Sequence, residues 1–371
     1  MAIKLSLKQV MVNFNSSTDT TLFVKKVYKE VKSRGLMLTD LNLIHCAMIH
    51  YQSRFKTDIS KRFQYTYLTI EPSLLKDKKY FYFDDGEKSE LQTQSSEVIG
   101  VGFAIALFQK LFDVNFNCIN EIINTGKRCD FEIYYKGKKI IAESKGRKGN
   151  LNQAANEITN QKTAHTTTVP KYGAISIIGR DANPTKIEVV DPPSEMDNIS
   201  RYERILSLLI YYTKVAQLSG YSQLASILNV RINEITKNNS KIDYYELKEI
   251  EYKNDLDESG YEIFTNIGEY KFCTFFHSYN NNGFKFRVRD DLQLFFGMDE
   301  NIKKYLEDQN FEALLNFNGK YNINFELTHI SIHNDGTSLI LIDDEEIEKS
   351  QQNNKIAHLW GNYNLYLYIE K

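Results

Sequence analysis

The sequence predicts an α/β protein in which a mixed β-sheet is flanked by helices, with α+β additions at its N-terminal and C-terminal ends. Residues 98–112 form an apolar run that is long enough for a buried helix and too long for one strand. Residues 129–145 contain two strand-like segments around a Lys-Gly turn, and a third buried segment follows at residues 171–179. Together these observations give a core with the order helix, strand, strand, helix, strand.

The first 90 residues are expected to form an N-terminal α+β region. Four apolar side chains lie near helical spacing between Asp19 and Lys32, which predicts an amphipathic helix there. Residues 80–83 are typical of a short strand, and the following Asp-Asp-Gly is a turn signal. Nothing in this region points to a catalytic group.

Residues 91–193 are expected to form the central core. Ser95 or Ser96 can cap its first helix, which continues through the apolar run. Residues 119–123 can add a strand before the hairpin. Within the hairpin, residues 129–135 alternate polar and apolar side chains and residues 140–145 form the second strand. Residues 150–165 then predict a helix rich in Gln and Ala.

A boundary is predicted near residue 193, because Pro184, Pro192 and Pro193 cluster there. Residues 194–371 are expected to form a C-terminal α+β domain that binds DNA or a partner. It begins with an amphipathic helix over residues 201–218 and ends in aromatic strand-like segments separated by Asn/Gly turns. Residues 221–238 faintly resemble a helix-turn-helix, although plain core helices explain them as well.

Composition limits the class of protein. The formal net charge is −2 and the isoelectric point is near 6.4. Nucleic-acid contact must therefore come from local basic clusters or from a partner. None of the four cysteines lies at zinc-ligand spacing, which favours free buried thiols. No signal peptide and no membrane-spanning apolar run is evident, so we expect a cytoplasmic protein without membrane contact.

The predicted hairpin carries the chemistry. If its turn centres on Gly137-Lys138, one face holds Asp130, Glu132, Glu143 and Lys145, with Asp130 opposite Lys145 and Glu132 opposite Glu143. Three carboxylates beside one lysine are unfavourable unless a cation lies among them. Mg²⁺ prefers oxygen ligands, polarises phosphates and lowers the pKa of bound water. These needs match phosphodiester hydrolysis.

Asp130 followed after twelve residues by Glu143-Ser144-Lys145 resembles the D-x(n)-E-x-K core of the PD-(D/E)XK nuclease superfamily. The resemblance covers residues 95–180 and implies a restriction-endonuclease-like mixed sheet. It implies that Asp130 and Glu143 bind Mg²⁺, for which Mn²⁺ can substitute, and that Lys145 assists the attacking water. Glu97 lies where family members often add a further acidic ligand, although a Glu at a helix start is also favoured by the helix dipole.

The tripeptide [D/E]-x-K alone is a weak signal, because it occurs six times in this chain. Only the occurrence at Glu143 follows an apolar run, has an acidic strand before it and precedes a helix. The alternative is an exposed, charged sheet face with cross-strand ion pairs. For Glu132 a charge at the rim of the site is the favoured interpretation.

Basic and amide side chains near the hairpin are candidates for phosphate contact. Lysines in the hairpin turn are equally well explained as solvated charges, and glutamines on the following helix as exposed positions. The nucleic-acid candidates are Lys127, Arg128, Arg147, Lys148 and Gln161.

The sequence therefore predicts a Mg²⁺-dependent DNA endonuclease acting on double-stranded DNA, in restriction or antiviral defence. A homodimer or a companion defence protein is a further expected partner. Two alternatives stay open: a nucleic-acid-binding or regulatory subunit of a defence or repair complex, and a repair or recombination nuclease.

Overall fold

Two structural units make up the chain, Met1–Thr57 with Lys61–Ser200 and Asp58–Ser60 with Arg201–Lys371. The computed structural model describes, some by backbone alone, residues 7–16, 18–51, 59–70, 73–75, 78–84, 89–122, 130–147, 153–158, 171–180, 183–190, 197–237, 260–267, 270–277, 285–289, 292–321, 330–343, 357–360 and 365–370. The sequence prediction placed a boundary at residue 193, and the unit boundary lies at residue 200.

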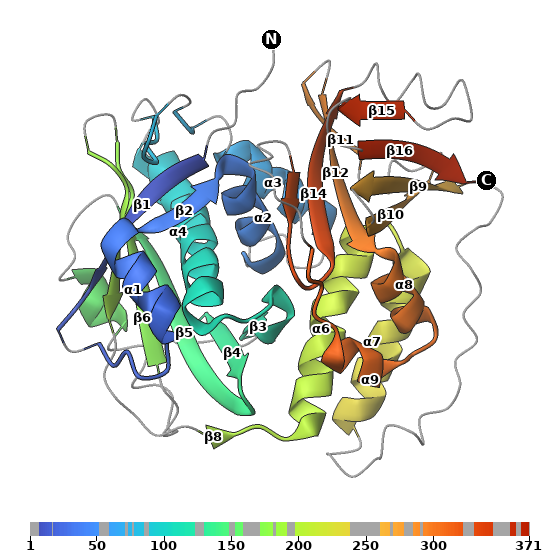
Figure 1. Ribbon diagram of the computed structural model, residues 1–371, viewed down its shortest axis with the longest axis horizontal. Helices are drawn as coiled ribbons and strands as arrows, with labels where there is room; N and C mark the ends of the chain where they lie inside the picture. Colours follow the sequence, from blue (N-terminus) through green and yellow to red (C-terminus); the bar gives the residue numbers. More distant parts are fainter. Residues whose placement is uncertain are drawn as a thin grey trace. The chain divides into compact units, whose positions relative to one another are not determined.

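Unit 1 is built on a mixed sheet with strand order β2-β1-β7-β6-β5-β4-β3, and β8 pairs with β5 (Figure 1). Strands β3, β4 and β5 are antiparallel neighbours, whereas β5 and β6 are parallel. The strands are β1 (Leu7–Phe14), β2 (Leu36–Thr39), β3 (Ile119–Glu121), β4 (Phe131–Tyr135), β5 (Lys138–Arg147), β6 (Lys171–Ile177), β7 (Lys186–Val190) and β8 (Asp197–Asn198). This confirms an α/β unit with a mixed sheet flanked by helices.

The N-terminal strands belong to this same sheet, although the sequence analysis assigned residues 1–90 to a region of their own. Strand β1 pairs in parallel with β7, with Met11 opposite Lys186. Strand β2 follows α1 through Gly35, whose φ of 76° suits glycine and whose α-hydrogen faces the carbonyl of Val10. Strands β1 and β2 therefore extend the sheet that carries the hairpin.

Helices flank this sheet: α1 (Lys25–Arg34), α2 (Asp40–His50), α3 (Ile59–Ile70), α4 (Ser89–Phe112) and the short 3₁₀ helix η1 (Phe116–Cys118). The predicted helix from Asp19 begins only at Lys25, because the Asp19 side chain accepts a hydrogen bond from the Thr21 amide and holds a turn there. Instead of the strand predicted at residues 80–83, isolated bridges occur at Tyr80 and Phe83.

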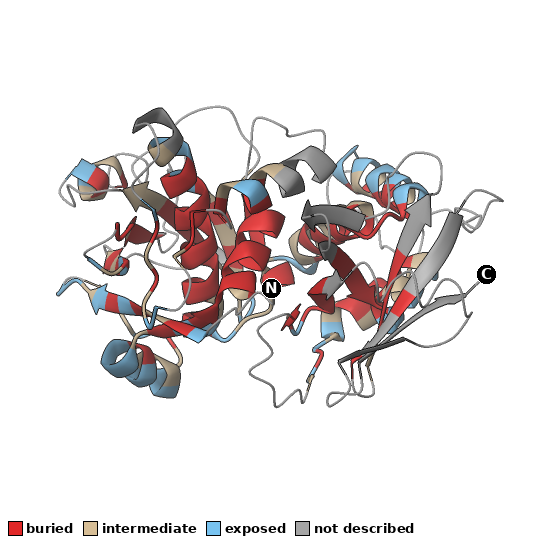
Figure 2. Ribbon diagram, turned by 90° about the horizontal axis from the view of Figure 1, so that it is seen from above, coloured by how far each residue is buried: buried red, intermediate tan, exposed pale blue. Residues whose placement is uncertain are grey.

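Helix α4 is the central helix of unit 1, and its residues 98–108 are all buried (Figure 2). It begins at Ser89, so Ser95 and Ser96 lie inside it and do not cap it as predicted. The stretch Gln92–Phe112 is long and apolar enough to cross a membrane, but 83% of its most apolar window is buried within the protein. That burial is consistent with the core helix of a soluble protein, and a cytoplasmic location stays a prediction.

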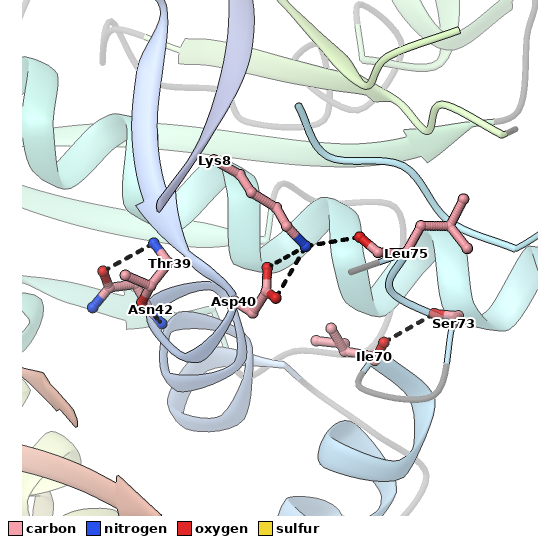
Figure 3. A network of polar contacts seen from close by, with 7 residues as sticks. All are labelled: Lys8, Thr39, Asp40, Asn42, Ile70, Ser73 and Leu75. Atoms are coloured by element: carbon pink, nitrogen blue, oxygen red, sulfur yellow. Dashed lines mark hydrogen bonds and ion pairs between the residues drawn. The ribbon is translucent and has the colours of Figure 1, made fainter. Parts of the chain in front are cut away.

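A buried ion pair joins β1 to α2 (Figure 3). The Nζ atom of Lys8 lies 2.8 Å from Oδ1 of Asp40 and donates to the carbonyl oxygen of Leu75 at 2.9 Å. Both charged side chains are inaccessible to solvent, so neither could lose its partner without leaving a buried charge. Thr39 caps α2 by accepting from the Asn42 amide, which fixes Asp40 at the first turn.

Unit 2 contains four helices and a second sheet among its described residues. Helix α6 (Arg201–Leu218) packs on α7 (Ser222–Lys237), and α8 (Glu300–Glu307) packs on α9 (Phe311–Asn316). The sheet has the order β13-β14-β12-β10-β9-β16-β15, with β11 on β12. Its strands are β9 (Gly260–Ile267), β10 (Tyr270–His277), β11 (Lys285–Arg289), β12 (Leu292–Asp299), β13 (Ile330–Ile332), β14 (Thr337–Asp343), β15 (Ala357–Trp360) and β16 (Leu365–Glu370).

The faint helix-turn-helix pattern at residues 221–238 is not borne out. Helix α7 runs without a break through Asn229, where the turn was expected. Arg231 is buried and binds Gln309 and Glu234, so its side chain is not available to read a base. The plain core-helix interpretation of this segment is therefore confirmed.

Candidate active site on the β4–β5 hairpin

The hairpin turn sets which residues meet across β4 and β5. Lys136 and Gly137 are its two central residues, and both have positive φ, as a two-residue hairpin turn requires. The predicted turn was centred one residue later, so the predicted register was wrong by two residues. Glu132 lies opposite Ile141 rather than Glu143. A shift of two residues keeps every side chain on its face, so the predicted acidic face is retained.

Glu143 and Lys145 lie together on β5. The side chain of Glu143 is 0% exposed, and its Oε1 atom lies 2.6 Å from Nζ of Lys145, which is 20% exposed. The donors beside the Glu143 carboxylate are Nζ of Lys145 and the backbone amide of Asp130, and neither makes a well-directed hydrogen bond with it. A buried carboxylate with so few donors is unusual, because desolvated charges are normally fully bonded.

Asp130 lies at the start of β4, beside Glu143. Its carbonyl oxygen accepts from the Ile122 amide at 2.9 Å, which fixes its backbone to the end of β3. Its Oδ2 atom accepts from the amide of Ser144 at 2.9 Å and from the Ser144 hydroxyl at 3.1 Å. The sequence analysis had assigned Ser144 to the core face alone, and the hydroxyl in fact orients the carboxylate of Asp130.

Burial and mutual repulsion perturb the carboxyl groups. Desolvation and the nearby Asp130 raise the pKa of Glu143 to about 8, although Lys145 opposes the shift. Desolvation likewise raises the pKa of Asp130, against the hydrogen bonds from Ser144. For Lys145, desolvation lowers the pKa, but the attraction of Glu143 outweighs it and the net shift is upward. Lys145 is therefore charged. The ionisation of Asp130 makes the ionisation of Glu143 less favourable, because the two negative charges repel each other.

Helix α4 brings Glu97 to the same end of the sheet. A methyl group on Gly146 would lie 1.6 Å from the carbonyl oxygen of Ser96, and one on Gly100 would lie 2.7 Å from the amide of Gly146. The helix thus contacts β5 directly beside Lys145, which only glycine permits. Glu97 is exposed, and the pKa of its carboxyl is raised, first by partial desolvation and then by Asp130.

Residues 153–158 are helical and cover the face of β5 and β6 that carries Glu143 and Lys145, opposite to the face that contacts α4. Gly173 and Ile175, which pair with Glu143 and Lys145, face Ile158 of this helix. Glu157 forms an ion pair with Arg147, and both are about one-third exposed. The negative charge of Glu157 also contributes to the raised pKa of Lys145. Sequence reasoning missed Glu157, because a Glu in a polar helix carries no distinguishing signal.

A second overlooked acid is Glu121 at the end of β3. It is buried and raises the pKa of Asp130. The segment had been expected to be a strand, but no pattern in the sequence indicated that its last residue would lie close to Asp130.

The other predicted site residues have varied outcomes. Glu132 pairs with Lys139 at 3.6 Å and accepts from the Tyr134 hydroxyl, which agrees with a charge at the rim. Arg147 is described and engaged by Glu157. The remaining nucleic-acid candidates, Lys127, Arg128, Lys148 and Gln161, lie outside the described residues.

The carboxylates of the site are few but suit a hard metal ion. Across the described ranges, no group of three or more His, Cys, Asp or Glu side chains is close enough together to hold a metal. Mg²⁺ commonly takes only one or two carboxylates and keeps several waters. Asp130 and Glu143 supply that number, and the buried oxygens of Glu143 are short of donors. The residues present therefore fit a hydrated divalent ion with two protein ligands.

Comparison of the chain with protein-family models, with curated proteins and with solved structures finds no match in any of the three.

Proposed function

We propose that this protein is a Mg²⁺-dependent deoxyribonuclease of the PD-(D/E)XK type, with Asp130, Glu143 and Lys145 as its active site. The observation that carries the proposal is the fully buried carboxylate of Glu143, which lies beside a second acid and has a pKa near 8. Such a pair is stable when ionised only if a cation neutralises it. Mn²⁺ is expected to replace Mg²⁺, because it accepts the same oxygen ligands.

The element order supports the same proposal. Unit 1 runs α4, β3, β4, β5, the helical residues 153–158 and then β6, with β3 to β5 antiparallel and β6 parallel to β5. This is the helix, strand, strand, strand, helix, strand order that the PD-(D/E)XK resemblance leads us to expect. Strands β1, β2 and β7 extend the sheet beyond that core.

Each side chain has a distinct task in this proposal. Asp130 and Glu143 would hold the ion, and Ser144 keeps Asp130 oriented for it. The bound ion would polarise the scissile phosphate and acidify a water molecule. Lys145, which is charged and partly exposed, is positioned to hold the phosphate or the attacking water. Glu97 is an additional acid near Asp130 and Lys145 that would contribute negative charge towards the ion.

Cleavage and metal binding test the proposal together. Supercoiled plasmid and linear duplex are incubated with Mg²⁺, Mn²⁺ or EDTA, and Mn²⁺ binding is followed by electron paramagnetic resonance. We expect metal-dependent cleavage that is lost in Glu143→Gln and Asp130→Asn. Glu132→Gln is the matched control, because it removes a carboxylate from the same hairpin face but from a rim pair. Equal Mn²⁺ binding by the wild type and Glu143→Gln would refute the site.

The products separate the settings in which a nuclease could act. Discrete fragments support restriction or antiviral defence, whereas progressive loss from ends supports repair or recombination.

The nucleic-acid-binding or regulatory alternative is favoured by the Glu143–Lys145 contact, because a lysine at 2.6 Å neutralises one acid without a metal. Duplex binding without cleavage, and without Mn²⁺ binding, would support that alternative.

A further inference from the structure

Helix α1 is the most basic helix among those the structure describes. Its ten residues include Lys25, Lys26, Lys29, Lys32 and Arg34 against a single acid, Glu30. The whole chain has a formal net charge of −2, whereas this helix is strongly positive and carries more charges per residue than the chain as a whole. A local cluster of this kind is what a mildly acidic protein needs in order to bind a polyanion.

All five cations of α1 are exposed to solvent, and the ribbon of α1 is mostly pale blue in Figure 2. In the part of the chain that the structure describes, none of them forms an ion pair. Among contacts between described residues, Lys32 is the one cation of α1 whose side chain is engaged, by the hydroxyl and ring of Tyr28. Their charges are therefore available to a ligand from outside unit 1.

The residues that lead into α1, together with the buried Val31, attach the helix to unit 1. The amide of Val24 donates to the carbonyl oxygen of Leu111 at 2.8 Å. Phe23 packs on Phe112 and Tyr172 with ring centroids 5.3 and 5.1 Å apart. Val31 is buried beneath the helix. The basic side chains consequently occupy a fixed outer surface, which we call the α1 basic surface.

Helix α4 connects this surface to the candidate active site. Leu111 adjoins α1, and Glu97 lies fourteen residues earlier on the same helix, which corresponds to about 21 Å along its axis. Duplex DNA advances about six base pairs over that length, at about 3.4 Å per pair. A short duplex is therefore long enough to span the distance between the two sites.

We propose that the α1 basic surface binds the phosphate backbone of double-stranded DNA and holds the substrate of the hairpin site. The choice of DNA rests on the function proposed above. A ten-residue helix is about 15 Å long, and duplex DNA carries about nine phosphate charges over that length. An anionic membrane fits less well, because the outer face of α1 presents lysines and polar groups but no large apolar side chain for insertion.

The test compares two charge-matched triple variants. Lys25→Gln, Lys26→Gln and Lys29→Gln together remove three charges from α1, and glutamine preserves helix propensity. The control removes three exposed charges from unit 1 outside α1 and the hairpin, with Lys78→Gln, Lys79→Gln and Lys186→Gln. Binding of a labelled random-sequence duplex is measured by fluorescence anisotropy in EDTA across a range of salt concentrations. Circular dichroism melting checks that both variants fold.

For wild type and control we expect equal affinity and equal salt dependence. For the α1 variant, the slope of log K against log salt should become shallower by about 2 to 3, and affinity at about 0.1 M salt should fall at least tenfold. Equal binding by the α1 variant and the control would overturn the proposal, as would no duplex binding by the wild type. Loss of binding to phosphatidylserine vesicles, with duplex binding unchanged, would also overturn it.

Because binding is measured in EDTA, this outcome is independent of catalysis. α1-dependent binding without cleavage in Mg²⁺ leaves the α1 proposal standing and removes the nuclease proposal. Cleavage that persists with unchanged binding in the α1 variant does the reverse.

Discussion

The carboxylate of Glu143 should destabilise the metal-free protein, and Glu143→Gln should relieve that effect. The folded pKa is about 8, against 4.5 for an ordinary glutamate. Below pH 4.5 the group is protonated in both states and has no effect. As pH rises from 4.5 to 8, the unfolded chain gains the free energy of ionisation while the folded protein does not, so stability falls. Glutamine matches the protonated acid in shape and never ionises.

The loss of stability at a given pH depends on how much of the interval between the unfolded and folded pKa values of Glu143 lies below that pH. At pH 7 the interval from 4.5 to 7 counts, and at 1.36 kcal/mol per unit it corresponds to about 3 kcal/mol. In EDTA, Glu143→Gln should therefore be about 3 kcal/mol more stable than the wild type at pH 7. The two proteins should be equal well below pH 4.5, where the acid is protonated in both states. With saturating Mg²⁺, the wild type should gain stability and the variant should not.

Urea denaturation followed by circular dichroism measures these free energies, and hydrogen exchange of peptides from β5 assigns the transition to unit 1. Glu132→Gln is the control, because Glu132 is about one-quarter exposed and paired with Lys139. Removing this partly exposed carboxylate should leave the stabilisation by Mg²⁺ as large as in the wild type. The reasoning is refuted if the difference between Glu143→Gln and the wild type is the same at pH 5 and pH 8. It is equally refuted if Mg²⁺ stabilises both proteins to the same extent.

Three further predictions follow from the same site. Protons compete with the metal for Glu143, so the Mg²⁺ concentration for half-maximal cleavage should fall as pH rises towards 8, by up to about tenfold per unit; a flat profile would exclude Glu143 as a ligand. Lys145→Met should lower kcat at least about 100-fold while leaving Mn²⁺ binding within about threefold of wild type, because a lysine that assists the water is not a ligand; unchanged kcat would remove Lys145 from the mechanism. Gly146→Ala should destabilise unit 1 by about 3 kcal/mol or more, since its methyl group would lie 1.6 Å from the carbonyl oxygen of Ser96. Gly137→Ala should be destabilised by about 1 kcal/mol, because its methyl group meets no atom and only the positive φ is unfavourable. Equal melting temperatures for the two variants would contradict this.

The parts of the fold that the sequence predicted are those with strong local signals. The apolar run at residues 98–112 lies in α4, and the alternating segment lies in β4. The pairing of β1 with β7 was not predictable, because Met11 and Lys186 are far apart in the chain and neither carries a pairing signal. The hairpin register was missed by two residues, since Lys136 adopts positive φ, which is uncommon for lysine.

In the candidate site, too, residues with local sequence signals were predicted and residues that act through long-range contacts were not. Asp130, Glu143 and Lys145 were found from spacing, and the structure brings them together. Ser144 and Glu157 were not found, because their roles arise from contacts: a hydroxyl bonded to Asp130, and an ion pair between β5 and the helical residues 153–158. Local patterns reveal which side chains share a strand face, but not which groups from other elements complete the site.

The β4–β5 hairpin contains one solvated ion pair and one pair with a buried carboxylate, and the two can be compared directly. Glu132 and Lys139 lie 3.6 Å apart and are each about one-quarter exposed, as an ordinary cross-strand ion pair on a solvated sheet face should be. Glu143 is fully buried, only 2.6 Å from Lys145, and has Asp130 beside it. A solvated face explains the first pair without further assumption. It does not explain why a second acid is placed against a desolvated carboxylate, because the single charge of Lys145 can neutralise only one of the two acids and leaves the other without a counter-ion. The contrast within one hairpin therefore favours a metal-binding function over a purely structural ion pair.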